Sequence, residues 1–303
     1  EFMGFSRTTV KDAYGGRIET SFNTNGANVY FRGRPVTVSN YDRYGKLLQR
    51  TNYHWYSKDW LPIYFRGNGF TDSSFIYLAD IDKSLYDAGS SGRRTRKDFI
   101  YQWNTTEKFG DLVKTIDYGD VDFNTGNDIG DDRVTTALTY TNDISFWILG
   151  LLQASVVTDQ SGNYLSKDRF NYDANGLIIK NETWNSLNKT ESWIAKDFSY
   201  DEYGNLSGIT DALGHQTRYS MDSVYKLFVV SVENDLKHKV TREYYGVNES
   251  TSEGSGIFGQ LKLIVDPNQQ KVWRTYDVWG RPLSLVSPLD SFAYPTRSWE
   301  YAQ

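Results

Sequence analysis

A short phrase recurs along the 303 residues of the chain: an aromatic residue, Asp, two variable residues and Gly. The copies are Tyr41-Asp42-Arg43-Tyr44-Gly45, Tyr172-Asp173-Ala174-Asn175-Gly176, Tyr200-Asp201-Glu202-Tyr203-Gly204 and Tyr276-Asp277-Val278-Trp279-Gly280. The Asp carboxylate can accept backbone hydrogen bonds within a turn, and Gly can adopt the positive φ that closes a hairpin. We therefore predict structural roles for these Tyr, Asp and Gly residues, with the Tyr and the following Leu (Leu47, Leu177, Leu206, Leu283) on the packed face of a sheet.

Degenerate copies of the motif and a second turn between copies show that the motif belongs to a repeat unit with a characteristic length. Met221-Asp222-Ser223-Val224-Tyr225 keeps the frame without Gly, and Tyr244-Tyr245-Gly246 holds the next position, so the intervals from Tyr172 to Tyr276 are 28, 21, 23 and 32 residues. A second turn within the unit contains Asp211 and Gly214, and Val265-Asp266-Pro267-Asn268-Gln269 resembles it more loosely. Two turns in about 21 residues leave about eight residues per strand. The predicted unit is a β-hairpin, and successive hairpins must pair to satisfy their edges.

The composition agrees with an all-β fold. The chain has 23 Tyr, 16 Phe, 9 Trp and 25 Gly but only 6 Pro, which favours strands joined by glycine turns. Polar and large side chains alternate in Lys239–Tyr244 and in Lys271–Tyr276, as in strands with one buried face. The nearest helix candidate, 144–157, is interrupted by Gly150, and we predict it to be a strand. The predicted fold is repeated antiparallel β-hairpins that form one long curved, spiralling sheet.

Charge and residue usage exclude several classes of partner. A net charge of −5 gives no electrostatic reason to expect a nucleic-acid partner, and the absence of Cys excludes disulfides and cysteine zinc sites. No signal-peptide pattern opens the chain, and the longest apolar run, 146–152, is too short to span a membrane. Neither end of the sequence has an obvious capping segment, so we expect a fragment of a longer protein.

One acidic loop is a calcium candidate. The stretch Asp120–Asp132 is dense in oxygen ligands, but Thr125 stands where an EF-hand loop needs Gly, and strands are predicted on both sides. A solvated loop is the favoured interpretation, with calcium binding left open.

Paired carboxylates and one basic cluster are further candidates. Asp80 with Asp82, or Asp131 with Asp132, could serve a glycoside hydrolase, although a polar strand face explains Asp80 and Asp82 equally well. The cluster Arg93-Arg94-Thr95-Arg96-Lys97 could bind an anionic surface but is more typical of a solvated strand end. The sequence therefore predicts no catalytic, cofactor-binding or metal residue.

The pattern Tyr-Asp-x-x-Gly-x-Leu, linked by Thr210, Asp211, Gly214 and Thr217, resembles the Rhs/YD repeat. The first half is more divergent but is similar to the YD-repeat region of Tc-type insecticidal toxin B components and related bacterial Rhs proteins. The segments that carry this similarity are Glu1-Phe2-Met3-Gly4-Phe5-Ser6-Arg7, Gly33-Arg34-Pro35, Phe109-Gly110-Asp111-Leu112 and the stretch from Thr136 to Leu151. The resemblance suggests a divergent YD-repeat region at 1–157 that continues into a clearer one at 158–303.

The resemblance implies a structural module without enzymatic activity. In that family the repeats form a β-sheet that spirals into a hollow shell and encloses a toxic C-terminal polypeptide. The expected partners are the remainder of the parent polypeptide and an enclosed toxin segment, with self-association through open sheet edges. The expected location is secreted or on the bacterial cell surface, and no cofactor is implied. Asp266-Pro267 matches only the start of the family's Asp-Pro-x-Gly-Leu cleavage signature, so neither self-cleavage nor a cargo is assigned.

Two alternatives stay open. Extracellular teneurins resemble the same repeat family, so an adhesion or glycan-binding module is the first; aromatic side chains clustered on the outer face would favour it. A hydrolase that uses paired carboxylates is the second, and it requires a deep pocket with two convergent acids.

Overall fold

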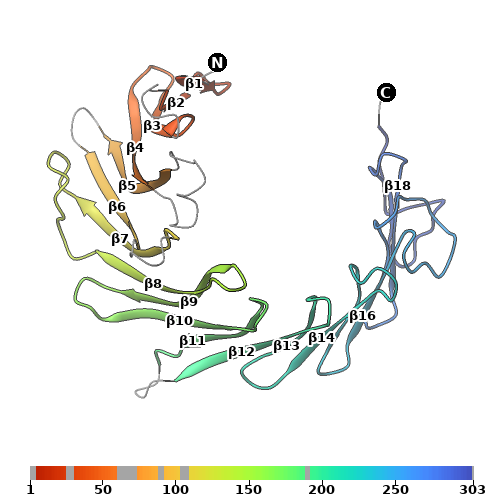
Figure 1. Cartoon of the computed structure of the whole chain (residues 1–303). Helices are drawn as coiled ribbons and strands as arrows, with labels where there is room; N and C mark the ends of the chain where they lie inside the picture. The colour runs from red at the N-terminus through yellow and green to blue at the C-terminus, as the bar shows by residue number, and fades with distance from the viewer. Residues whose placement is uncertain are drawn as a thin grey trace, which may run out of the picture. The chain divides into compact units, whose positions relative to one another are not determined.

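The computed structural model describes residues 5–24, 31–59, 74–87, 92–102, 109–187 and 192–301. The secondary-structure elements named in these ranges are all β-strands, and they pair in antiparallel fashion, as Figure 1 shows. Among the described residues, no helix is long and apolar enough to cross a membrane. The predicted all-β class with antiparallel hairpins is confirmed. The segment at 1–4 that contributed to the family resemblance lies outside the described residues.

The chain divides into two compact units. Unit 1 comprises Glu1–Arg169 with Thr183–Ser192, and unit 2 comprises Phe170–Glu182 with Trp193–Gln303. The sequence boundary between 157 and 158 stays a prediction, and each unit is described by itself below.

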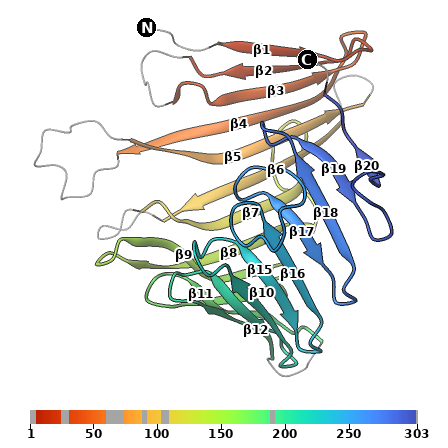
Figure 2. The ribbon, with the colours of Figure 1, turned by 90° about the vertical axis from the view of Figure 1, so that its right-hand side faces the viewer.

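Unit 1 is an antiparallel meander in which each strand pairs with the next one along the chain. Figure 2 shows its first strands side by side. The strands are β1 (Arg7–Lys11), β2 (Arg17–Phe22), β3 (Pro35–Tyr41), β4 (Leu47–Asp59), β5 (Ser74–Tyr86), β6 (Gly92–Tyr101), β7 (Leu112–Val121), β8 (Val134–Asp143), β9 (Ile148–Thr158) and β10 (Tyr164–Tyr172), of which β10 continues into unit 2.

Aromatic rings pack across the long strands of unit 1. Tyr77 of β5 lies 6.2 Å from Tyr56 of β4 and 5.2 Å from Tyr101 of β6, measured between ring centroids, and Phe75 lies 6.2 Å from Tyr101. These four rings cover large apolar areas at neighbouring register positions, which is how cross-strand pairs stabilise a sheet.

Unit 2 is a second antiparallel meander, with shorter strands. Successive strands pair from β12 to β20. The strands are β11 (Ile178–Trp184), whose last residues fall in unit 1, β12 (Trp193–Tyr200), β13 (Leu206–Thr210), β14 (Gln216–Met221), β15 (Val229–Asn234), β16 (Lys239–Tyr244), β17 (Leu261–Val265), β18 (Lys271–Tyr276), β19 (Pro282–Val286) and β20 (Arg297–Ser298). The predicted strands at Lys239–Tyr244 and Lys271–Tyr276 are thus β16 and β18.

The prediction of a strand over 144–157 is wrong at its start. β9 begins at Ile148, and residues 144–147 form the turn that joins it to β8. The carboxylate of Asp143 accepts hydrogen bonds from the backbone N–H groups of Ser145 and Phe146 at 2.9 and 3.2 Å. Trp147 has a φ of 56°, so the chain reverses there instead of continuing as a strand.

Candidate functional site

The repeated Asp turn has one geometry, which the Asp201 copy illustrates. Its carboxylate Oδ1 accepts hydrogen bonds from the backbone N–H groups of Tyr203 and Asn205, both at 2.9 Å. Asp201 N–H donates to the carbonyl of Asn205 at 2.9 Å, and Gly204 N–H donates to the carbonyl of Asp201 at 3.1 Å. Gly204 has a φ of +82°. This is a three-residue hairpin loop whose last residue is left-handed, with the bulge that follows from it.

The same hydrogen bonds recur at the other motif positions. In each turn, Oδ1 of the Asp accepts from the N–H groups two and four residues later, at 2.8 to 2.9 Å; these residues are Asp42, Asp173, Asp211 and Asp277. The glycines of the same turns have φ between +79° and +89°; they are Gly45, Gly176, Gly214 and Gly280. Tyr41, Tyr172, Tyr200 and Tyr276 are the last residues of β3, β10, β12 and β18 and are half-buried.

The sequence search missed further copies of this turn. Asp12 accepts from Tyr14 and Gly16 at 2.8 and 2.9 Å, and Asp159 accepts from Asn163 at 2.8 Å. Their turns also contain a glycine with positive φ, but the residue before each Asp is not aromatic. The spacing Asp-x-x-Gly alone would have found them.

Gly204→Val should lower the free energy of unfolding by about 1 to 3 kcal/mol, because a β-branched residue is strained at a φ of +82°. A Cβ at Gly204 would lie 3.7 Å from Leu177 Cδ1, an ordinary contact, so backbone strain accounts for the loss. Urea denaturation measures it. The control Glu202→Val, at an exposed position of the same turn, should change stability by less than about 0.5 kcal/mol. Equal effects of the two substitutions would refute this assignment of strain.

Several motif tyrosines clamp a neighbouring strand. The hydroxyl of Tyr200 donates to the carbonyl of Ile178 at 2.8 Å, that of Tyr244 to Val229 at 3.0 Å, and that of Tyr276 to Leu261 at 3.1 Å. Each acceptor is the first residue of the preceding strand, β11, β15 or β17. The tyrosine thus adds a side-chain bond where the backbone ladder gives way to the turn, which explains an aromatic residue with a hydroxyl at this position.

Tyr200→Phe should cost about 1 kcal/mol of unfolding free energy, since it removes only the hydrogen bond to the Ile178 carbonyl. Tyr203→Phe is the matched control, because the side chain of Tyr203 is exposed at the tip of the adjacent turn. We expect chemical denaturation to separate the two variants by roughly this amount. A Tyr200→Phe protein as stable as the control would show that the clamp contributes nothing.

Asp222 holds an expanded version of the turn. Its two carboxylate oxygens accept four backbone N–H bonds, from Val224 and Tyr225 on Oδ2 and from Leu227 and Phe228 on Oδ1. The residue is 2% exposed. Burial raises the pKa of Asp222, but the four backbone donors outweigh it and lower this pKa to about 2.

Acid should destabilise the fold through these carboxylates. The pKa of Asp222 falls from 3.8 to about 2 on folding. Its contribution to stability is therefore complete above about pH 4 and is lost as the pH falls toward and through 2. The backbone N–H of His215 is the main cause that lowers the pKa of Asp211, so protonation of Asp211 also lowers the stability of the fold. Urea denaturation between pH 6 and 2 should show this loss of unfolding free energy. In the Asp222→Asn variant, the unfolding free energy should depend less on pH over the same range. Constant stability down to pH 2 would contradict this account.

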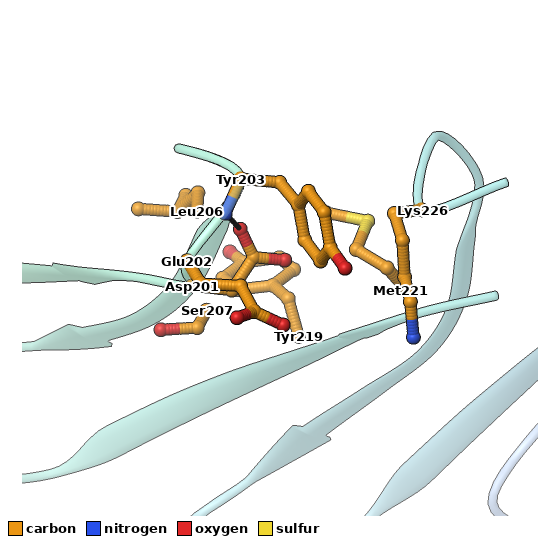
Figure 3. Close-up of a pocket in the computed structure, with 8 residues that line it drawn as sticks. All are labelled: Asp201, Glu202, Tyr203, Leu206, Ser207, Tyr219, Met221 and Lys226. Carbon is orange, nitrogen blue, oxygen red and sulfur yellow. Dashed lines mark hydrogen bonds between the residues drawn. The ribbon is translucent and has the colours of Figure 1, made fainter. Parts of the chain in front are cut away.

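A shallow pocket lies beside the Asp201 turn. It encloses about 340 Å³ and is lined by Asp201, Glu202, Tyr203, Leu206, Ser207, Tyr219, Met221 and Lys226. Figure 3 shows the Tyr203 ring beside Met221, with Glu202 and Lys226 also on the lining. Asp201 is committed to the turn, because Oδ1 binds two N–H groups and Oδ2 accepts from the Asn205 side chain at 3.1 Å. The pocket therefore offers an aromatic face with polar neighbours and does not present a pair of available acids.

The acidic loop Asp120–Asp132 does not gather its carboxylates. The carboxylate of Asp122 accepts hydrogen bonds from the backbone N–H groups of Asn124 and Thr125. The carboxylate of Asp132 accepts one from the backbone N–H of Asp120 at 3.0 Å. Asp128 lies 3.3 Å from Arg133. The hydrogen bonds of Thr125 are the main cause that lowers the pKa of Asp122. The structure therefore shows a loop closed by its own hydrogen bonds, and its acids are not grouped as a calcium site.

Asp80 and Asp82 do share a face of β5, but each has a partner. Asp80 contacts Nδ1 of His54. Oδ1 of Asp82 accepts a hydrogen bond from Nε of Arg94 at 3.0 Å and forms an ion pair with Nη2 of Arg94 at 2.9 Å. Arg96 binds Asp98 through two bonds of 2.7 and 3.0 Å. These bonds draw two arginines of the basic cluster into pairs along the sheet, which disfavours its role as an anion-binding surface.

A polar row that sequence reasoning missed lies next to these pairs and shares Arg94 with them. Glu19, Ser39, Arg50, Ser84 and Arg94 occupy directly opposed register positions on five successive strands, β2 to β6. Ser39 and Ser84 on this row are buried, as is the neighbouring Asp82. Because register decides which side chains meet, separate polar residues in the sequence could not reveal the row.

The chain was compared with protein families, curated proteins and solved structures, and matches were found among the solved structures alone. No protein-family model matches the chain, and no curated protein matches it. The crystal structure of TcdB2-TccC3 without its hypervariable C-terminal region matches with a TM-score of 0.61 at 10% identity, over 89% of this chain and 19% of that one. TcdB2-TccC3-TEV matches with a TM-score of 0.63 at 10% identity, over 94% and 20%. The chain has the fold of these TcdB2-TccC3 structures.

This match confirms, at the level of the fold, the resemblance to Tc-type and related Rhs proteins that the repeats predicted. The chain spans about one-fifth of the length of the TcdB2-TccC3 chains, 19% and 20%.

Proposed function

We propose that this chain is a structural repeat module without enzymatic activity, part of a β-sheet shell that encloses or displays a toxin or effector polypeptide. The observation that carries the proposal is the shared fold with TcdB2-TccC3 over 94% of this chain, within 20% of the matched chain. The parent would be a secreted or surface-exposed bacterial protein of the Tc or Rhs type. Its other segments would be the principal partners of this module.

The motif residues support a structural role. The carboxylate of each motif Asp accepts hydrogen bonds from backbone N–H groups, and each motif Gly supplies the left-handed residue of a turn. A residue type that repeats with the same bonds on successive hairpins serves the repeat, since a catalytic site needs one unique constellation. In the proposed shell, these turns set the register with which strands are added one after another.

Protection from protease tests this proposal on the natural polypeptide that contains these residues. The folded protein should yield, under limited proteolysis with mass spectrometry, a continuous segment outside this chain that is cleaved only after the shell is unfolded with urea. If every segment outside this chain is cleaved equally fast before and after unfolding, enclosure is contradicted. Because an enclosed segment needs no fixed fold of its own, its protection must come from the surrounding sheet.

Glycan binding is a second candidate function, favoured by the pocket beside Tyr203. The Tyr203 side chain is exposed, and a flat aromatic face with carboxylate and hydroxyl neighbours is suited to a sugar ring. On a glycan array, the wild-type chain should bind and Tyr203→Ala should lose most of the signal. Tyr44→Ala is the control, since Tyr44 is exposed at another Asp turn. No binding by the wild type, or equal loss in both variants, would remove this candidate.

A further inference from the structure

His54, Asp80 and Asp82 come together on one face of unit 1. His54 of β4 lies directly opposite Asp80 of β5 in the strand register. Asp82 is two residues along the same strand, and residues at i and i+2 share a face of a sheet. β4 and β5 run side by side in Figure 2. Two adjacent strands therefore supply one imidazole and two carboxylates to the same patch.

The three groups are close enough to bind a single ion. His54 Nδ1 contacts Asp80 Oδ1 and lies 3.8 Å from Asp82 Oδ2, and the three ligand atoms lie within 4.8 Å of one another. Ligands on a tetrahedral zinc ion, at about 2.1 Å from the metal, are about 3.4 Å apart. Small side-chain rotations would bring the three atoms to these separations.

Arg94 prepares Asp82 for this role. Its guanidinium binds Oδ1 of Asp82 through two atoms, at 3.0 and 2.9 Å, and Asp82 is 4% exposed. This contact fixes the carboxylate with Oδ2 toward His54, as outer hydrogen bonds orient metal ligands. A metal-bound imidazole is neutral, so the two carboxylates and one guanidinium would leave one net negative charge for the cation to offset. Arg96 is engaged by Asp98.

We propose that His54 Nδ1, Asp80 and Asp82 form a binding site for zinc or a similar divalent transition-metal ion. The imidazole favours such an ion over calcium or magnesium, which take oxygen ligands. Three protein ligands leave a coordination position for water, and His54 is half-exposed, so the ion has a route from solvent. The ion would join β4 to β5 beyond their backbone hydrogen bonds. This inference does not depend on the proposed shell function.

Zinc titration tests the site. Isothermal titration calorimetry of the chain should show one saturable zinc site, and His54→Ala should weaken the affinity at least about 10-fold. His54→Ala removes a half-exposed side chain, so the variant should fold, as circular dichroism will show. Asp80→Asn should weaken zinc binding as well. In NMR spectra, zinc should shift the ring resonances of His54 and leave those of His215 and His238 in place.

His215→Ala is the matched control. His215 also pairs with an aspartate, Asp211 at 3.1 Å, but among the described residues no second carboxylate joins this pair as a group of metal ligands. Its zinc affinity should equal that of the wild type. The proposal is overturned if the wild type shows no saturable binding, if His54→Ala binds as tightly as the wild type, or if His215→Ala weakens binding to the same degree.

Discussion

Replacing Asp222 with alanine should lower the free energy of unfolding by about 3 kcal/mol or more. The substitution leaves four backbone N–H groups without their acceptor, those of Val224, Tyr225, Leu227 and Phe228. Because the carboxylate is buried, water replaces it poorly. Urea denaturation at pH 7, where Asp222 is ionised, measures the full effect.

The control for Asp222 is Asp211→Ala. Asp211 accepts only two backbone N–H bonds, at the exposed tip of its turn, where water can take the place of the carboxylate. Its loss of stability should be clearly smaller. If both variants lose the same stability, burial and the number of donors do not govern these turns, and the interpretation of Asp222 fails.

Glu249→Gln should destabilise unit 2 by about 3 kcal/mol, the lower end expected when a buried ion pair loses one partner. The ammonium of Lys262 is fully buried, contacts the Thr251 carbonyl and lies 2.5 Å from Glu249 Oε2. The ring of Tyr245, whose pKa burial raises to about 12, lies 5.2 Å from that ammonium. The substitution would leave the charge of Lys262 without its counter-ion. The partial exposure of Glu249 keeps the expected loss at this lower end.

A surface pair gives the comparison for Glu249. Glu233 lies 3.1 Å from Lys237, whose side chain is 69% exposed. Glu233→Gln should therefore cost less than about 1 kcal/mol. Thermal or urea denaturation of both variants would separate a buried pair from an exposed one. A Glu249→Gln protein as stable as Glu233→Gln would show that Lys262 finds other compensation.

The hairpins could be predicted because their determinants are local. Asp201 and Gly204 act within five residues of each other, so the sequence spacing contains the turn geometry. At the second turn of a later repeat, Gln269 takes a φ of 64° where the Asp211 turn has Gly214, and the Asp266 carboxylate still accepts two N–H bonds. The sequence resemblance is looser there because the Gly is missing, yet the turn has the same hydrogen bonds.

The rest of the molecule depends on contacts between distant residues. The tyrosine bonds and the grouping of His54 with Asp80 follow from strand register, which brings together residues 15 to 26 positions apart. The burial of Lys262 depends on the loop between β16 and β17, which places Glu249 and Thr251 against its ammonium. The strand predicted from Ile144 failed for a local reason, because the Asp143 cap and the positive φ of Trp147 outweighed an apolar run. Apolar content alone does not distinguish a strand from an exposed turn.

Cryo-electron microscopy of the natural polypeptide that contains these residues tests the shell proposal most directly. We predict that β1 to β20 appear as consecutive strands in the wall of a closed shell, with additional density for polypeptide inside it. A parent protein in which these strands form an isolated module, exposed to solvent on both faces with no enclosed chain, would contradict the proposed function.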